Sequence, residues 1–110
     1  MTPKKVKERF EKMEWPRQLG NLASTLGRVS TRAVVPENDE LTKNLLHEAI
    51  LFIEWSAPHA PENFHLELAI LQRELIAWKR LWPLDPARSI LSLQARNRSD
   101  RLLQMAGLVG

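Results

Sequence analysis

Seven prolines divide this chain into segments, and their positions constrain its fold more than any other feature. Proline is tolerated in the first turn of an α-helix and beyond its end, but it breaks a helix interior. Pro61 and Pro86 are placed to begin helices. Pro58 and Pro83 follow long apolar-periodic stretches and are placed to end them. The spacing predicts long helices over residues 16–33, 39–57, 61–82 and 86–106, preceded by a short helix over 3–14.

The rest of the pattern predicts an all-α protein. No segment shows the sustained two-residue alternation of a β-strand. Residues 58–60 and 83–85 are short links, which favour antiparallel neighbours. We therefore predict an antiparallel four-helix bundle with a short additional N-terminal helix. The 110 residues suit one helical domain over 1–110, in which residues 1–15 form a leading helix that is either flexible or loosely packed.

Composition excludes several classes of protein. The chain has no cysteine, which excludes disulfide scaffolds, thiolate zinc sites and cysteine nucleophiles. Its longest purely apolar run, Ala49–Ile53, is far shorter than the roughly 20 residues of a membrane-spanning helix. The basic N-terminus is not followed by the apolar stretch of a secretory signal. We expect a cytoplasmic protein without a membrane partner or a cofactor.

Charge is distributed unevenly along the chain. Residues 1–35 carry eight Lys/Arg and three Asp/Glu, a net charge of +5. Residues 36–82 carry four and eight, a net charge of −4, and residues 83–110 carry four and two, a net charge of +2. The basic and acidic segments either attract each other, within one chain or between chains, or form separately solvated faces.

The segment 61–82 carries two apolar stripes at helical spacing. The core stripe comprises Phe64, Leu68, Leu71, Leu75, Trp78 and Trp82. The second stripe comprises Leu66, Ile70, Ala77 and Leu81. Glu67 and Glu74 border the second stripe on one side, and Arg73 and Arg80 border it on the other. Since a soluble helix must cover two apolar stripes or expose one, the second is either covered by the leading helix, with Val6, Phe10 and Met13, or is a subunit interface.

The helix over 16–33 carries a core stripe, and the helix over 39–57 is expected to sit deep in the bundle. The first carries Leu19, Leu22, Ala23, Leu26 and Val29, and the second carries Leu41, Leu45, Leu46, Ala49, Ile50, Phe52 and Ile53. Leu51 and Trp55 interrupt the polar face of the second helix and are candidates for a partner surface. Gly20, Ser24, Gly27 and Thr31 form a stripe of small residues, which indicates either close helix–helix approach or a groove for a ligand.

The helix over 86–106 is the most polar. Its core side comprises Leu91, Ala95, Leu102, Ala106 and Val109, with Ser99 in the middle. The run Arg96–Arg101 interrupts the apolar pattern, so we expect the helix to bend there or to restart with Ser99 as a cap.

Two sets of residues suggest chemistry. Arg88, Arg96, Arg98 and Arg101, with Arg28 and Arg32, form a possible anion-binding or nucleic-acid-binding patch, unless they pair with Glu48, Glu54, Glu67 or Glu74. Glu62 and His65 match the Glu-x-x-His spacing of di-iron helical bundles. The chain has no second copy of that motif, and a glutamate in the first turn also suits the helix dipole.

These features favour a small, non-enzymatic protein-interaction or regulatory bundle that acts as a homodimer through Leu66, Ile70, Ala77 and Leu81. The alternatives are an anion or nucleic-acid binder that uses the arginines of the last helix, and a metal-dependent enzyme that uses Glu62 and His65. No catalytic residue and no cofactor are predicted; a homo-oligomer is expected, and a protein partner is favoured over nucleic acid.

Overall fold

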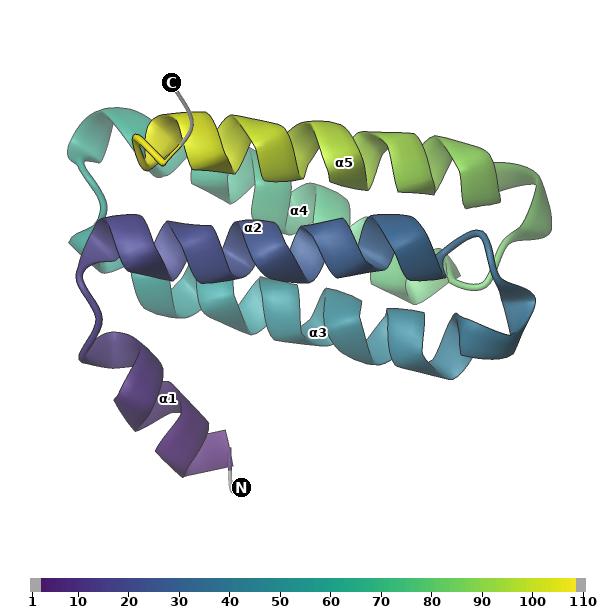
Figure 1. Ribbon diagram of the computed structural model, residues 1–110, viewed down its shortest axis with the longest axis horizontal. Coiled ribbons are helices and arrows are strands. Elements are labelled where there is room, and N and C mark those ends of the chain that lie inside the picture. The colour runs from purple at the N-terminus through teal and green to yellow at the C-terminus, as the bar shows by residue number, and fades with distance from the viewer. Residues whose placement is uncertain (1–2, 109–110) are drawn as a thin grey trace.

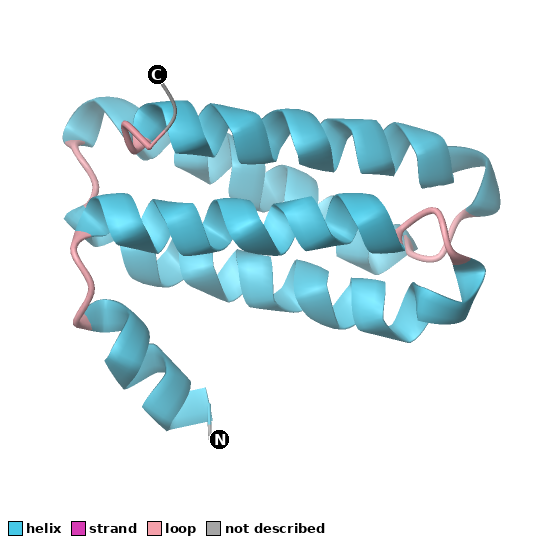
Figure 2. Ribbon diagram, in the orientation of Figure 1, coloured by secondary structure: helices cyan, strands magenta, loops and turns pink. Residues whose placement is uncertain are grey.

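The computed structural model describes residues 3–108 and is all-helical over that range (Figures 1 and 2). Its five α-helices are α1 (Pro3–Glu11), α2 (Trp15–Arg32), α3 (Asp39–Ser56), α4 (His65–Leu81) and α5 (Arg88–Met105). Short 3₁₀ turns occupy Pro36–Asn38, Ala57–His59, Glu62–Phe64 and Asp85–Ala87, and the described residues contain no strand. The prediction of an all-α protein is confirmed.

Two helices begin later than the prolines predicted. Pro61 and Pro86 lie at single 3₁₀ turns, and the α-helices start at His65 and Arg88. The amide of Phe64 donates to the carbonyl of Pro61 at 2.9 Å, an i to i+3 bond that tightens the turn before the helix. The prolines therefore initiate the helical segments without occupying the first α-helical turn.

Helix α2 occupies the centre of the packing. The closest helix pairs are α2 with α5 and α2 with α3, followed by α3 with α4. Figure 1 shows α2 and α5 on the near side of the molecule, with α4 behind them. The predicted inner face of α2 is confirmed, because all five of its apolar residues are fully buried.

The predicted core stripe of α4 is also correct at its centre. Leu68, Leu71 and Leu75 are buried, and Trp82 is buried just beyond the helix. Trp78 is half-buried at the edge of the core. In α3 the expected core residues are buried or half-buried except Leu41, which is exposed in the first turn.

Helix α1 packs on α3 and leaves the second stripe of α4 uncovered. The ring of Phe10 stacks on Phe52, with ring centroids 4.5 Å apart, and lies 5.8 Å from the ring of Trp55. The buried amide of Gln18 holds the end of α1 by donating to the carbonyl of Phe10 at 3.1 Å. The alternative in which the leading helix covers the α4 stripe is therefore wrong, because α1 packs its aromatic ring against those of α3 instead.

Helix α5 runs unbroken through the polar residues that were expected to bend or restart it. The Ser99 hydroxyl faces α2 and donates to the carbonyl of Ala23 at 2.7 Å, so it joins two helices instead of capping one. Leu91, Ala95, Leu102 and Ala106 are buried as predicted, whereas Val109 lies outside the described residues.

Candidate functional site

The exposed side of α4 is the candidate site. Leu66, Ile70 and Leu81 have 73%, 54% and 63% of their surface exposed, and Ala77 between them is also exposed. Exposed apolar residues continue into the α4–α5 link and onto α5, at Leu84, Ile90 and Leu93. We call these seven residues the α4–α5 apolar face. The three residues outside α4 were missed in the sequence, although Ile90 and Leu93 are three residues apart on a helix whose other side carries the core pattern.

Ion pairs line the groove between α4 and α5. Arg98 binds Glu74 through two hydrogen bonds of 3.1 and 3.2 Å. Arg101 binds Glu67 through two hydrogen bonds of 2.8 and 3.1 Å. The hydrogen bonds from Arg101 lower the pKa of the Glu67 carboxyl from its ordinary value. These pairs tie the acidic border of the α4 stripe to α5, so Glu67 and Glu74 are already engaged within the chain.

A small apolar cavity opens beside Leu81. It has a volume of about 80 Å³. It is lined by Trp78, Leu81, Trp82, Leu84, Ala87, Ile90 and Leu91. A second cavity of about 130 Å³ lies further along the same groove and is lined in part by Ile70 and Met105. The apolar face is therefore hollowed at two places where side chains of a partner could insert.

The arginines of α5 do not form the patch that the sequence suggested. Arg88 lies at the start of α5, where it binds both carboxylate oxygens of Asp39 at 2.6 and 2.8 Å. It also pairs with Asp85 and lies over the ring of Trp82, with its Cζ 5.2 Å from the ring centroid. Together with the Arg98 and Arg101 pairs, this leaves Arg96 as the one arginine of α5 without an ion pair in the described chain. Pairing with acidic residues, the alternative from the sequence, is confirmed at Glu67 and Glu74.

The structure does not gather metal ligands around Glu62 and His65. The Nε2 atom of His65 lies 3.0 Å from the carbonyl oxygen of Ala60. This hydrogen bond engages the imidazole within the chain, at the turn before α4. Glu62 is exposed in the adjacent 3₁₀ turn. Across residues 3–108, no cluster of three or more His, Asp or Glu side chains is arranged to hold a metal ion.

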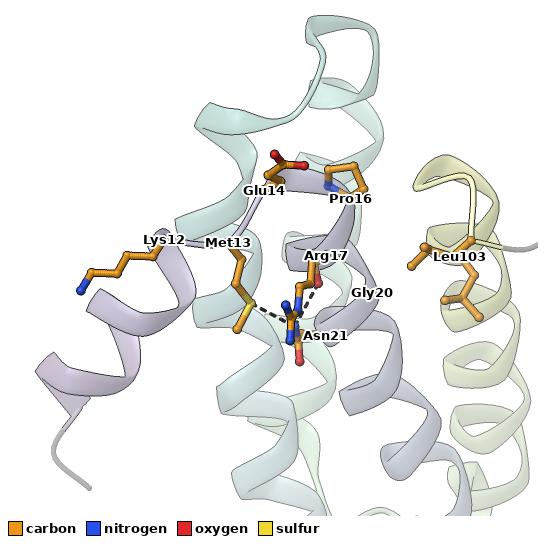
Figure 3. A pocket seen from close by; sticks show the side chains of 9 residues that line it. Lys12, Met13, Glu14, Pro16, Arg17, Gly20, Asn21 and Leu103 are labelled. Atoms are coloured by element: carbon orange, nitrogen blue, oxygen red, sulfur yellow. Dashed lines mark hydrogen bonds between the residues drawn. The ribbon is translucent and has the colours of Figure 1, made fainter.

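An open pocket lies between the end of α1, the first turns of α2 and the end of α5 (Figure 3). Its volume is about 680 Å³, and its apolar walls include Met13, Leu103 and Leu108. The two side chains that could bring positive charge are Lys12 and Arg17, but Figure 3 shows Lys12 pointing away from the pocket. Asn21 spans the space by donating to the carbonyl of Arg17 at 3.0 Å and to the sulfur of Met13 at 3.2 Å.

Comparisons with protein-family models, curated proteins and solved structures found no match to this chain. None of the helices within residues 3–108 combines the length and the apolar character that a membrane crossing requires. Function must therefore be inferred from the site alone.

Proposed function

We propose that this chain is a small cytoplasmic protein-binding module whose α2–α5 helices form an antiparallel four-helix bundle and which pairs with a second copy of itself. The α4–α5 apolar face is the contact surface, with Leu66, Ile70, Ala77 and Leu81 at its centre. Because the chain has no cysteine, its fold does not depend on an oxidising compartment.

The exposure of three large aliphatic side chains along one helix face carries the proposal. Single exposed apolar residues are ordinary, but soluble monomers seldom expose a contiguous apolar patch of this kind. Leu66, Ile70 and Leu81 lie on one side of α4, and Leu84 and Ile90 extend the same face. No other element of the described chain covers it, because α1 packs on α3. A two-fold pairing would bury the same patch on both copies.

The α4 stripe within this face is flanked by polar residues, as are the apolar centres of many protein interfaces. Arg73 and Arg80 are exposed along one border of the α4 stripe, and the Arg98–Glu74 and Arg101–Glu67 pairs form the other. Glu67 and Glu74 remain partly exposed, but each is already paired with an arginine. A partner that packs on the stripe therefore does not bury an unpaired charge there.

Light scattering on wild type and Ile70→Glu tests the proposal. At tens of micromolar we expect wild type to be a dimer and Ile70→Glu to be a monomer, because the new carboxylate would be buried without a partner. Circular dichroism should show equal helicity, since Ile70 is already half-exposed in the single chain.

Ile76→Glu is the matched control. Ile76 lies on the same helix and is partly exposed, but it faces away from the stripe by helical spacing. This variant should remain a dimer. A monomeric wild type would overturn the proposal. If both variants lose the dimer to the same extent, the interface does not depend on Leu66, Ile70 and Leu81.

A further inference from the structure

The arginines of α2 and α5 differ in whether a carboxylate holds them. Arg88, Arg98 and Arg101 are held by carboxylates, as described above. Arg17, Arg28 and Arg32 on α2, with Arg96 on α5, are exposed and have no ion pair within the described chain. An exposed arginine gains little from a surface ion pair, but several that share a face create a positive potential.

Helix α2 presents this charge along one face. Its 18 residues contain three arginines and no Asp or Glu. Arg17, Ser24, Arg28 and Thr31 are spaced by seven, four and three residues, so they share the exposed side opposite the buried row. The small side chains of Ser24 and Thr31 lie between the arginines and allow a ligand to approach the helix closely.

Arg96 extends the face across to α5. Ser92 and Ser99 both bond to α2, through Ser30 and Ala23 respectively. Arg96 follows Ser92 by four residues and precedes Ser99 by three, which places it on the same side of α5. It therefore stands beside α2 at the level of Gly27, whose added Cβ would lie 3.8 Å from the Ser99 hydroxyl.

We propose that the outer face of α2, with Arg96, is a second binding surface that takes the phosphodiester backbone of a nucleic acid without reading its sequence. Arginine forks match phosphate oxygens, and a helix of 18 residues is about 27 Å long, enough to follow several successive phosphates. The face carries no aromatic side chain that would stack on bases, so the contacts are to the backbone.

An anionic membrane is the other large polyanion that such a face could meet. Membrane-surface helices insert exposed apolar side chains beside their basic residues. Within residues 15–32, no large apolar side chain is exposed. Nucleic acid is therefore the favoured partner, and the membrane becomes an outcome of the test.

Fluorescence anisotropy with a labelled 20-nucleotide DNA, single-stranded and duplex, tests this surface at KCl concentrations from about 25 to 200 mM. Four phosphate contacts predict a slope of about −3 to −4 in log affinity against log salt. Arg28→Gln/Arg32→Gln should make the slope shallower by about two, because two phosphate contacts are lost.

Lys4→Gln/Lys7→Gln is the matched control, because it removes the same charge from exposed positions on α1, outside both proposed surfaces. It should leave the slope unchanged, and both variants should keep the wild-type helicity. An equal effect of the two pairs would show attraction by net charge alone and would overturn the proposal. So would an absence of DNA binding at 25 mM KCl, or binding only to vesicles that contain phosphatidylserine. Ile70→Glu should bind DNA as a monomer. That result would show that DNA binding by α2 does not require the homodimer.

Discussion

Arg88 joins three parts of the molecule through one side chain. Its guanidinium binds Asp39 at the start of α3, pairs with Asp85 before α5, and donates to the carbonyl of Ala33 beyond α2 at 3.1 Å. These hydrogen bonds hold the pKa of the Asp39 carboxyl below its ordinary value. The residue thus stabilises the end of the molecule where α2, α3 and α5 meet.

Arg88→Met should lower the melting temperature at neutral pH, because it leaves Asp39 without its cationic partner. A carboxyl with a lowered pKa in the folded state stabilises the protein above its unfolded pKa, near 4, and this contribution is lost as the pH falls through the folded pKa. The difference in melting temperature between wild type and Arg88→Met should therefore shrink from pH 7 to pH 3. Calorimetry at several pH values measures it.

Arg96→Met provides the comparison for that experiment. It makes the same substitution on the same helix at an exposed arginine without an ion pair in the described chain. Its melting temperature should follow wild type at every pH. If Arg88→Met also follows wild type throughout, the contact with Asp39 contributes nothing measurable.

At the level of the elements, the buried and exposed sides of α4 predict losses of stability of different size for the same kind of truncation. Leu75 is fully buried, so Leu75→Ala should lower the free energy of unfolding by about 2–5 kcal/mol through lost burial and a cavity. Ile76→Ala removes an exposed side chain next to it and should cost about 1 kcal/mol or less. Urea melts measure both, and similar losses would mean that the core stripe is misassigned.

The small-residue stripe of α2 gives a second prediction for a helix. A Cβ added at Gly27 would have its nearest neighbour, the Ser99 hydroxyl, at 3.8 Å, an ordinary contact. Gly27→Ala should therefore raise the free energy of unfolding by about 0.5–1 kcal/mol, because alanine is the better helix former. At Gly20 the added Cβ would come within 2.8 Å of the end of the Leu108 side chain, so that substitution requires Leu108 to move. A Gly27→Ala variant less stable than wild type in urea would show a tighter α2–α5 contact.

Periodicity and proline placement predicted the helices and most of the buried rows, because those signals are local. The position of α1 was not predictable, because the sequence offers Phe10 two apolar surfaces to pack on. One is the second stripe of α4, and the other is the aromatic pair Phe52 and Trp55. Trp55 was accordingly misjudged as a candidate partner surface, whereas it packs against Phe10. The partners of Arg98 and Arg101 also depend on which helix lies beside α5, which spacing along one helix does not encode.

At the scale of the whole molecule, the proposed homodimer ties stability to concentration. A partner that binds only the folded chain adds stability by mass action. The melting temperature of wild type should therefore rise between about 2 and 200 µM protein, whereas that of Ile70→Glu should stay constant. Differential scanning fluorimetry at matched salt measures both, and a wild-type melting temperature independent of concentration would contradict the dimer.

The dependence of α2 on α5 has a consequence for how the protein is made in the cell. The contacts that seal α2 join residues far apart in the chain, such as Ser30 with Ser92 and Ala23 with Ser99. While the ribosome is still adding α3 and α4, the leucines of α2 have only part of their final cover. The apolar row of α2 therefore stays partly uncovered until α5 has been made, and during that interval the nascent chain is exposed to aggregation.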